Sequence, residues 1–129
     1  ELTRLGVASL SVLAADRVTA ERARPSAAGA TFYARSVSDP LGRTLLERAD
    51  LVVRLDPATS VDDELLGPHL TVIDLADGGV SELRSRALAL GALTFNRRDV
   101  EAYRFELALS QILGGSVGLE PILTMFHRL

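Results

Sequence analysis

The chain has 129 residues, of which 47% are hydrophobic and 24% charged, and its formal net charge is −3. This length and balance predict one globular domain, and the acidic charge argues against nucleic acid or an anionic membrane as the main partner. All 14 basic residues are arginine, and cysteine is absent. A lysine Schiff base, a phosphate-loop lysine, a disulfide and a thiolate metal site are therefore excluded within these residues.

Five short runs rich in β-branched and aromatic residues predict five strands. They lie at residues 8–15, 30–37, 50–56, 70–76 and 92–95. Between the runs, apolar residues recur three and four positions apart, which is typical of helices. The predicted helices cover residues 18–28, 39–49, 81–90 and 100–113, and a short one follows Glu120 and Pro121.

Helix-boundary residues agree with this assignment. Asp39 and Pro40 have the types expected at an N-cap and a first helical position. Gly91 and Gly114 follow predicted helices where a left-handed residue commonly ends them. Strands that alternate with helices predict an α/β fold: a Rossmann-like, mostly parallel sheet with helices on both faces. A flavodoxin-like sheet of five strands is the alternative.

The segment after the first predicted strand carries the most chemical information. Asp16 and Arg17 stand side by side there. An acid at the end of a Rossmann second strand accepts hydrogen bonds from the adenosine ribose and favours NAD, whereas an arginine there can bind the 2′-phosphate of NADP. The plainer interpretation is that Asp16 caps the next helix and Arg17 is solvated.

Other candidate motifs are weaker. The chain has no G-x-G-x-x-G and no phosphate-binding loop, and Gly78-Gly79 is more typical of a turn. Residues 62–64 (Asp-Asp-Glu) have the pattern of an acidic first helical turn, and His69 that of a surface histidine. With only two histidines in the chain, we predict no metal site.

The order of these segments resembles the nucleotide-binding domain of the shikimate dehydrogenase family. The resemblance rests on ADRVTAERA, ADLVVRLDPAT, LTVIDLADGG and LRSRALALGA, followed by a helix that ends in Gly-Gly. The family has Asn-Arg-Thr-x-x-Arg-Ala after strand two, a phrase like Ala-Asp-Leu-Val-Val-Asn-Ala-Thr-Pro at strand four and Val-Val-Asp-Leu-Val-Tyr at strand five. The match covers about residues 2 to 129. It implies an NADP- or NAD-binding domain of an oxidoreductase of aromatic amino acid biosynthesis.

The resemblance also implies roles for particular residues. Asp16 and Arg17 fall at the adenosine-ribose site. Further cofactor contacts fall after the fourth and fifth family strands, and two positions face the substrate. The implied cofactor contacts are Arg54, Leu55, Asp56 and Ala76, and the implied substrate contacts are Asp77 and Arg104.

Several positions depart from the family pattern. Asp77 stands where the family has tyrosine and Arg104 where it has glutamine. Residues 97–100 (Arg-Arg-Asp-Val) replace a Gly-x-Gly-Met stretch near the nicotinamide. Glycines let the backbone approach a ligand, and bulky charged residues there change which ligand is tolerated.

The family's first domain, with its Lys–Asp catalytic pair, and its first Rossmann strand have no counterpart in this sequence. That strand belongs in the middle of the order 3-2-1-4-5-6, where its absence would leave two strand edges unpaired. We therefore expect residues 1–129 to be one NAD(P)-binding domain of a longer chain. The catalytic groups and much of the small-molecule substrate site would lie in the missing domain.

The resemblance thus predicts hydride transfer between nicotinamide and a cyclic hydroxy or keto acid, in a cytoplasmic protein without a nucleic-acid or membrane partner. Edge strands at residues 30–37 or 92–95 would allow a homodimer. The departures favour a different hypothesis, a degenerate α/β module without catalysis that acts in protein association.

Overall fold

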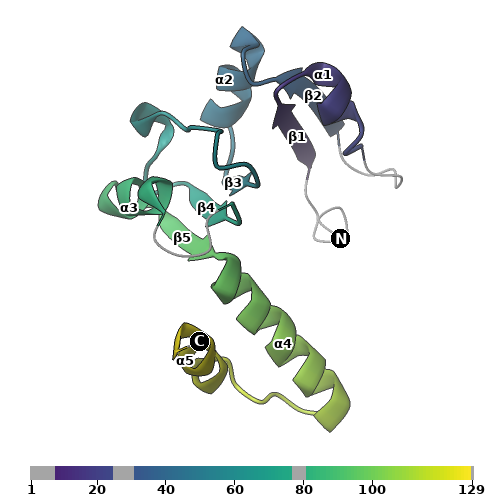
Figure 1. The fold of residues 1–129 in the computed structure, drawn as a ribbon, viewed down its shortest axis with the longest axis vertical. Coiled ribbons are helices and arrows are strands. Elements are labelled where there is room, and N and C mark those ends of the chain that lie inside the picture. Colours follow the sequence, from purple (N-terminus) through teal and green to yellow (C-terminus); the bar gives the residue numbers. More distant parts are fainter. Residues whose placement is uncertain (1–7, 25–30, 77–80, 129) are drawn as a thin grey trace. The chain divides into compact units, whose positions relative to one another are not determined.

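The computed structural model describes residues 8–24, 31–76 and 81–128. Strands and helices alternate along the chain up to β5, and two helices follow (Figure 1). The contacts divide the chain into two compact units, Glu1–Ala49 and Asp50–Leu129, and each is described by itself. The expectation of a single domain stays a prediction.

The first unit is a two-stranded parallel sheet with two helices. Leu10 of one strand lies opposite Phe32 of the other, and the register continues to Ala14 opposite Ser36. Its elements are β1 (Ser9–Ala14), α1 (Arg17–Glu21), β2 (Thr31–Ser36) and α2 (Pro40–Glu47).

Helices α1 and α2 pack against this sheet through small residues. Ala20 of α1 is fully buried, and the guanidinium of Arg24, just beyond α1, lies 4.6 Å from the centre of the Phe32 ring. Gly42 of α2 is buried, and a Cβ placed on it would lie 3.4 Å from Leu13 Cδ2. The register places Leu13 and Phe32 on opposite faces of the sheet, so contacts cover both faces.

The second unit is built on three parallel strands in the order β3-β4-β5. The strands align so that Val52, Val72 and Thr94 are neighbours across the sheet. The elements are β3 (Leu51–Arg54), the 3₁₀ helix η2 (Asp63–Leu65), β4 (Thr71–Asp74), α3 (Glu82–Ala89) and β5 (Leu93–Asn96).

The two faces of this sheet differ in burial. Val72 and Asp74 project from β4 on one face and are fully buried, and α3, with its buried Leu83, contacts β4 and β5. On the opposite face Leu51 is 41% exposed and Leu93 58% exposed. The core of this unit therefore lies on the α3 side.

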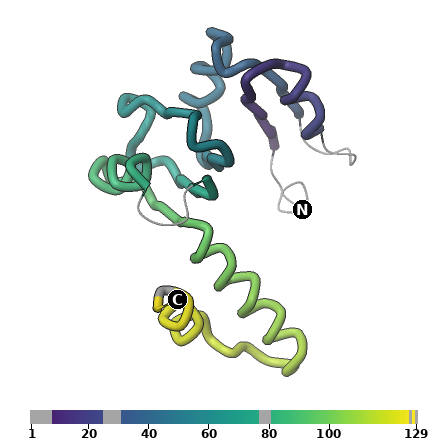
Figure 2. The backbone as a smooth tube through the Cα atoms, viewed as in Figure 1, coloured from purple at the N-terminus to yellow at the C-terminus, as the bar shows by residue number. Residues whose placement is uncertain are grey.

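Two further helices complete the second unit, α4 (Arg97–Leu113) and α5 (Glu120–Arg128). Helix α4 ends at Gly114, whose φ of 70° is left-handed. The chain then turns back and α5 lies beside α4 (Figure 2). The rings of Phe105 and Phe126 meet across this contact with centroids 5.9 Å apart.

The α/β class with parallel strands is confirmed, and a strand forms within or near each of the five predicted runs. Asp39 caps α2 with Pro40 in its first turn, as predicted. Helix α1 ends at Glu21, earlier than predicted, and residues 25–28 of the predicted helix lie outside the described residues. The order within each sheet, β1-β2 and β3-β4-β5, occurs in both the Rossmann-like and the flavodoxin-like layouts, so the flavodoxin-like alternative stays open. In the part of the chain that the structure describes, no helix is long and apolar enough to cross a membrane.

Candidate functional site

The predicted site residues that follow strands occupy the carboxyl ends of β1, β3 and β4. Asp16 and Arg17 follow β1 in the first unit. Residues 54–56 end and follow β3, and Ala76 lies two residues after β4 in the second unit. Parallel α/β proteins bind ligands at the carboxyl ends of their strands. Asp77 lies outside the described residues.

Asp16 is the N-cap of α1, as its plainer interpretation predicts. Its Oδ1 accepts a hydrogen bond from the backbone N of Thr19 at 2.8 Å, and its Oδ2 accepts one from Thr19 Oγ1 at 2.8 Å. These hydrogen bonds to the charged form lower the pKa of Asp16. The exposed carboxylate is therefore ionised at neutral pH, and each oxygen has a second lone pair for a further donor.

Arg17 is the first residue of α1, and its side chain is exposed. It places a permanent positive charge next to the carboxylate of Asp16. The first unit therefore presents adjacent opposite charges at the carboxyl end of β1.

Two serines that were not among the predicted site residues lie at the same edge. The hydroxyl of Ser36 donates to the carbonyl of Ala15 at 3.2 Å and lies 2.8 Å from the hydroxyl of Ser38. The register that pairs Ala14 with Ser36 brings them there, and no motif in the sequence marks them.

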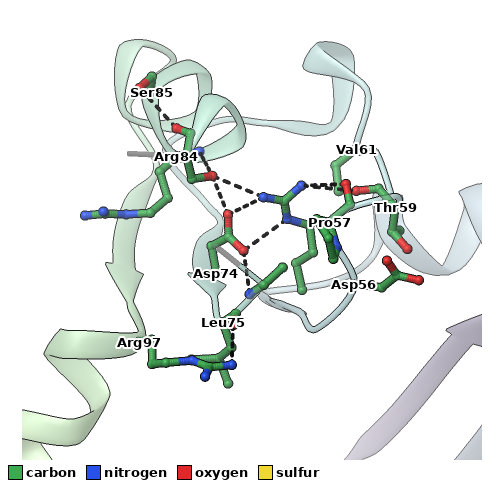
Figure 3. A network of polar contacts seen from close by, with 12 residues as sticks. Asp56, Pro57, Thr59, Val61, Asp74, Leu75, Arg84, Ser85 and Arg97 are labelled. Carbon is green, nitrogen blue, oxygen red and sulfur yellow. Dashed lines mark hydrogen bonds and ion pairs between the residues drawn. The ribbon is translucent and has the colours of Figure 1, made fainter. Parts of the chain in front are cut away.

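In the second unit, the side chain of Arg54 binds Asp74 of β4 at two points. Figure 3 shows the contacts around Asp74 as dashed lines. Arg54 Nε donates to Asp74 Oδ1 at 3.0 Å, and Arg54 Nη2 donates to Asp74 Oδ2 at 2.5 Å. The Arg54 side chain is 9% exposed and that of Asp74 is fully buried. A two-point pair of this kind has the planar geometry that suits a guanidinium and a carboxylate.

Asp74 also holds the segments that follow β4. The backbone N of Ala76 donates to its Oδ1 at 3.1 Å, and the hydroxyl of Ser81 donates to its Oδ2. Burial by itself raises the pKa of Asp74, but the hydrogen bonds from Arg54 and Ser81 outweigh it, and the pKa lies below the ordinary value. Asp74 is therefore an ionised, fully bonded carboxylate at neutral pH.

Ser81 links this carboxylate to α3. It is the N-cap of that helix, and its hydroxyl accepts a hydrogen bond from the backbone N of Arg84 at 3.2 Å. One buried group thus fixes both the end of β4 and the start of α3.

Leu55 and Asp56 lie in a turn just after Arg54. Asp56 Oδ1 accepts a hydrogen bond from the backbone N of Ala58 at 2.9 Å, and the carbonyl of Asp56 accepts one from the backbone N of Thr59 at 3.1 Å. The side chain of Leu55 is 73% exposed. This turn presents an apolar side chain to solvent at the carboxyl edge.

Arg97, which the resemblance places near the nicotinamide, lies at the end of β5. Arg97 begins α4 directly after Asn96, and its Nη2 donates to the carbonyl of Leu75 at 2.9 Å. Its exposed guanidinium therefore lies between the ends of β4 and β5.

Arg104 is not brought to this edge. It lies seven residues beyond Arg97 in α4, about 10 Å along the helix axis, and is exposed. Seven residues are close to two full turns, so the two arginines share one side of α4.

Asp74 and Ser81 are not among the predicted site residues, although they organise this edge. The signal available in the sequence is a charged residue inside each of two apolar strand segments, DLVVRLD and LTVIDLA. Aligning those segments in parallel places Arg54 opposite Asp74.

Asp74 is saturated with donors and is therefore a structural carboxylate and not a group free for proton transfer. The exposed residues at the strand ends are Asp16 and Arg17 in the first unit and Leu55, Asp56 and Arg97 in the second. No group of three or more His, Asp or Glu residues that could hold a metal ion occurs in the described ranges.

The fold defines an α/β protein in which, in each unit, polar residues lie at the carboxyl ends of parallel strands. In comparisons with known proteins, no family model, no curated protein and no solved structure matches the chain.

Proposed function

We propose that the chain is the cofactor-binding domain of a shikimate-dehydrogenase-like NAD(P)-dependent oxidoreductase. The observation that carries the proposal is the position of Asp16 and Arg17, which follow a parallel strand directly and open the next helix. An acid and an arginine at this place in a Rossmann-like fold suit the adenosine ribose and a 2′-phosphate.

The strand order within each sheet is consistent with the proposal. In the order 3-2-1-4-5-6, the resemblance makes β1 and β2 the counterparts of the second and third strands, and β3, β4 and β5 those of the fourth to sixth. The pairs β1-β2, β3-β4 and β4-β5 are neighbours in that order, and each pair is parallel.

The residues fit the two halves of a dinucleotide unequally. At the adenosine half, Asp16 has lone pairs that can accept hydrogen bonds from ribose hydroxyls, and Arg17 has an exposed guanidinium that can bind a phosphate. At the nicotinamide half, the side chain of Arg97 extends from the end of β5 to the carbonyl of Leu75 after β4. The family has a glycine at the position of Arg97. The bound cofactor would supply hydride transfer, and this chain's own residues would orient it.

Each residue at the edge then has a defined task. Arg17 binds the 2′-phosphate when the cofactor is NADP, whereas Asp16 accepts the ribose hydroxyls of NAD and repels that phosphate. Leu55 supplies an apolar contact beside Asp56, and Ala76 leaves space for the cofactor. Asp77 and Arg104 contact the substrate, a cyclic hydroxy or keto acid, and the remaining substrate contacts come from another domain.

Calorimetric titration of the protein with NAD and with NADP tests the proposal. We expect Arg17→Ala to weaken NADP binding by about 10- to 100-fold, because a charge-assisted contact is lost, and to leave NAD binding within about twofold. Asp16→Asn keeps a helix cap but removes the charge, so it should weaken NAD binding and strengthen NADP binding.

Matched controls come from the second helix of the same unit. Asp39 caps α2 as Asp16 caps α1, and Arg43 is an exposed arginine on α2. Asp39→Asn and Arg43→Ala should leave both affinities unchanged. A folded wild-type protein that binds neither nucleotide would overturn the proposed function.

A second candidate function is association with another protein through the edge of β3. The observation that favours it is the exposure of Leu51 (41%) and Val53 (40%). The carbonyls of Asp50 and Arg54 bond to β4, so by the parallel pattern the N–H and C=O groups of Leu51 and Val53 point away from it.

Sedimentation velocity over a range of concentrations tests this candidate. If a strand of another molecule pairs with β3, Val53→Lys should abolish the assembly, since an edge lysine blocks strand pairing. Leu93→Lys is the matched control, because Leu93 lies on the opposite edge strand, β5, on the same exposed face as Leu51 and Val53, and this substitution should leave the assembly intact. A protein that stays monomeric and captures no added partner would argue against association.

A further inference from the structure

The side chain of Arg54 ties the turn after β3 to the sheet. The turn residues Asp56, Pro57 and Thr59 are labelled in Figure 3. Arg54 Nη1 donates to the carbonyl of Pro57 at 3.3 Å and to the carbonyl of Thr59 at 3.4 Å. Another edge of the same guanidinium is bound to Asp74 and, through Nη2 at 3.2 Å, to the hydroxyl of Ser81.

These contacts use the full donor set of the side chain. A guanidinium has five N–H groups in a rigid plane. Two bonds go to Asp74, two to the carbonyls of the turn and one to Ser81. A group whose donors are committed in this way has no capacity left for a direct bond to a ligand.

We propose that Arg54 is a positioning residue of the cofactor site, which fixes the turn of residues 55–59 and so sets where Leu55 and Asp56 meet the ligand. The inference rests on the proposed function, and it replaces a direct cofactor contact of Arg54 with an indirect role. Asp74 fixes the position of Arg54, because its buried carboxylate orients the guanidinium before any ligand binds.

Lysine could not perform this task. An ammonium group carries three donors on one nitrogen, whereas the acceptors around Arg54 lie along different edges of its planar guanidinium. Arg54→Lys keeps the positive charge next to Asp74, and it loses the bonds to the carbonyls of Pro57 and Thr59. The variant therefore separates the geometry of the side chain from its charge.

The experiment combines amide hydrogen exchange with calorimetric titration on the full chain. In Arg54→Lys we expect the amides of Ala58 and Thr59 to exchange about tenfold faster, and the dissociation constant for the nucleotide that the wild type binds to rise by about tenfold. Exchange in α4 should stay within about twofold of the wild type, which a general loss of stability would not permit.

Arg86→Lys is the matched control. Arg86 likewise bridges a carboxylate and a backbone carbonyl, with Nη1 2.5 Å from Asp63 Oδ1 and Nη2 3.4 Å from the carbonyl of Val61. It holds η2 and not the turn after β3, so its substitution should leave nucleotide binding unchanged. Should Arg54→Lys fail to fold, Arg54→Met combined with Asp74→Leu removes the tether without leaving a buried charge.

Unchanged exchange at Ala58 and Thr59 in a folded variant would overturn the positioning role, whatever the affinity. Faster exchange with unchanged nucleotide binding would overturn it as well, because the turn would then be irrelevant to the ligand. A wild type that binds neither NAD nor NADP overturns the proposed function and, with it, a role for Arg54 in that site. Exchange and titration therefore distinguish the two failures.

Discussion

Arg54 and Asp74 stand directly opposite each other in neighbouring parallel strands, and their side chains form a buried two-point ion pair. Removing charges from water is costly, so such a pair is weak evidence that it stabilises the fold relative to apolar residues. Removing one partner is different, because the remaining charge stays buried without compensation. The pair therefore ties the end of β3 to the end of β4 for as long as both members are present.

The first prediction concerns this pair. Arg54→Met should lower the free energy of unfolding by about 3–5 kcal/mol, because Asp74 is left as an unpaired buried carboxylate. Arg54→Met together with Asp74→Leu should cost much less than the sum of the two single substitutions. Urea unfolding of the wild type, both single variants and the double variant gives the coupling directly.

An exposed pair in the first unit supplies the comparison. Arg43 and Glu47 lie 3.3 Å apart in α2, with side chains 48% and 50% exposed. Arg43→Met should change the free energy of unfolding by less than about 1 kcal/mol, because solvent screens both charges. Equal costs for Arg43→Met and Arg54→Met would show that burial of the Arg54 pair has no energetic consequence.

The second prediction follows from the lowered pKa of Asp74. A carboxyl group whose pKa is lower in the folded than in the unfolded state stabilises the fold above its ordinary pKa, and this stabilisation is lost as pH falls through the folded value. The free energy of unfolding should therefore decrease below about pH 4. Asp74→Asn should be less stable at neutral pH and show a shallower loss in acid.

Urea unfolding at a series of pH values measures this slope. Asp16 also has a lowered pKa, so Asp16→Asn is the informative comparison. Because Asp16 is exposed, its removal should flatten the acid dependence less than removal of Asp74 does. A curve for Asp74→Asn parallel to that of the wild type would contradict the prediction.

Much of the secondary structure could be predicted because its causes are local. The run DLVVRLD is typical of a strand in any surroundings, and the pair Asp39-Pro40 encodes a helix start through its own backbone and side-chain geometry. Helix α4 begins three residues earlier than predicted, at Arg97, because Asn96 and Asp99 form a reciprocal cap that the apolar pattern does not reveal.

The site was harder to predict because its contacts are set by strand register. Arg54 and Asp74 are 20 residues apart, and only parallel pairing of their strands brings them together. The sequence favours Arg54 as a cofactor contact since its position follows the family pattern. Its five donors meet acceptors within the protein, and these contacts depend on the tertiary fold.

The third prediction concerns the left-handed residue after α3. Gly91 has a φ of 89°, and a Cβ placed on it would lie 3.2 Å from Pro68 Cγ. Gly91→Ala should therefore lower the free energy of unfolding by about 1–2 kcal/mol from backbone strain alone, with any clash adding to that cost.

Gly115→Ala is the control for Gly91→Ala. The φ of Gly115 is not positive, and no atom lies within 4 Å of a Cβ placed there. That substitution should be neutral or stabilise by about 0.4–1 kcal/mol, because it restricts the unfolded chain. Thermal unfolding measured by calorimetry distinguishes the two, and equal melting temperatures would count against the argument from φ.

The last prediction concerns the junction between β5 and α4. Asn96 Oδ1 accepts a hydrogen bond from the backbone N of Asp99 at 2.9 Å, and Asp99 Oδ2 accepts one from the backbone N of Asn96 at 2.8 Å. No loop separates the strand from the helix, so this reciprocal cap alone ends one element and starts the next. Asn96→Ala should cost about 1 kcal/mol in the free energy of unfolding, whereas Asn96→Ser, which keeps an acceptor, should cost less. If the alanine and serine variants unfold at the same urea concentration, the side chain of Asn96 does not determine where α4 begins.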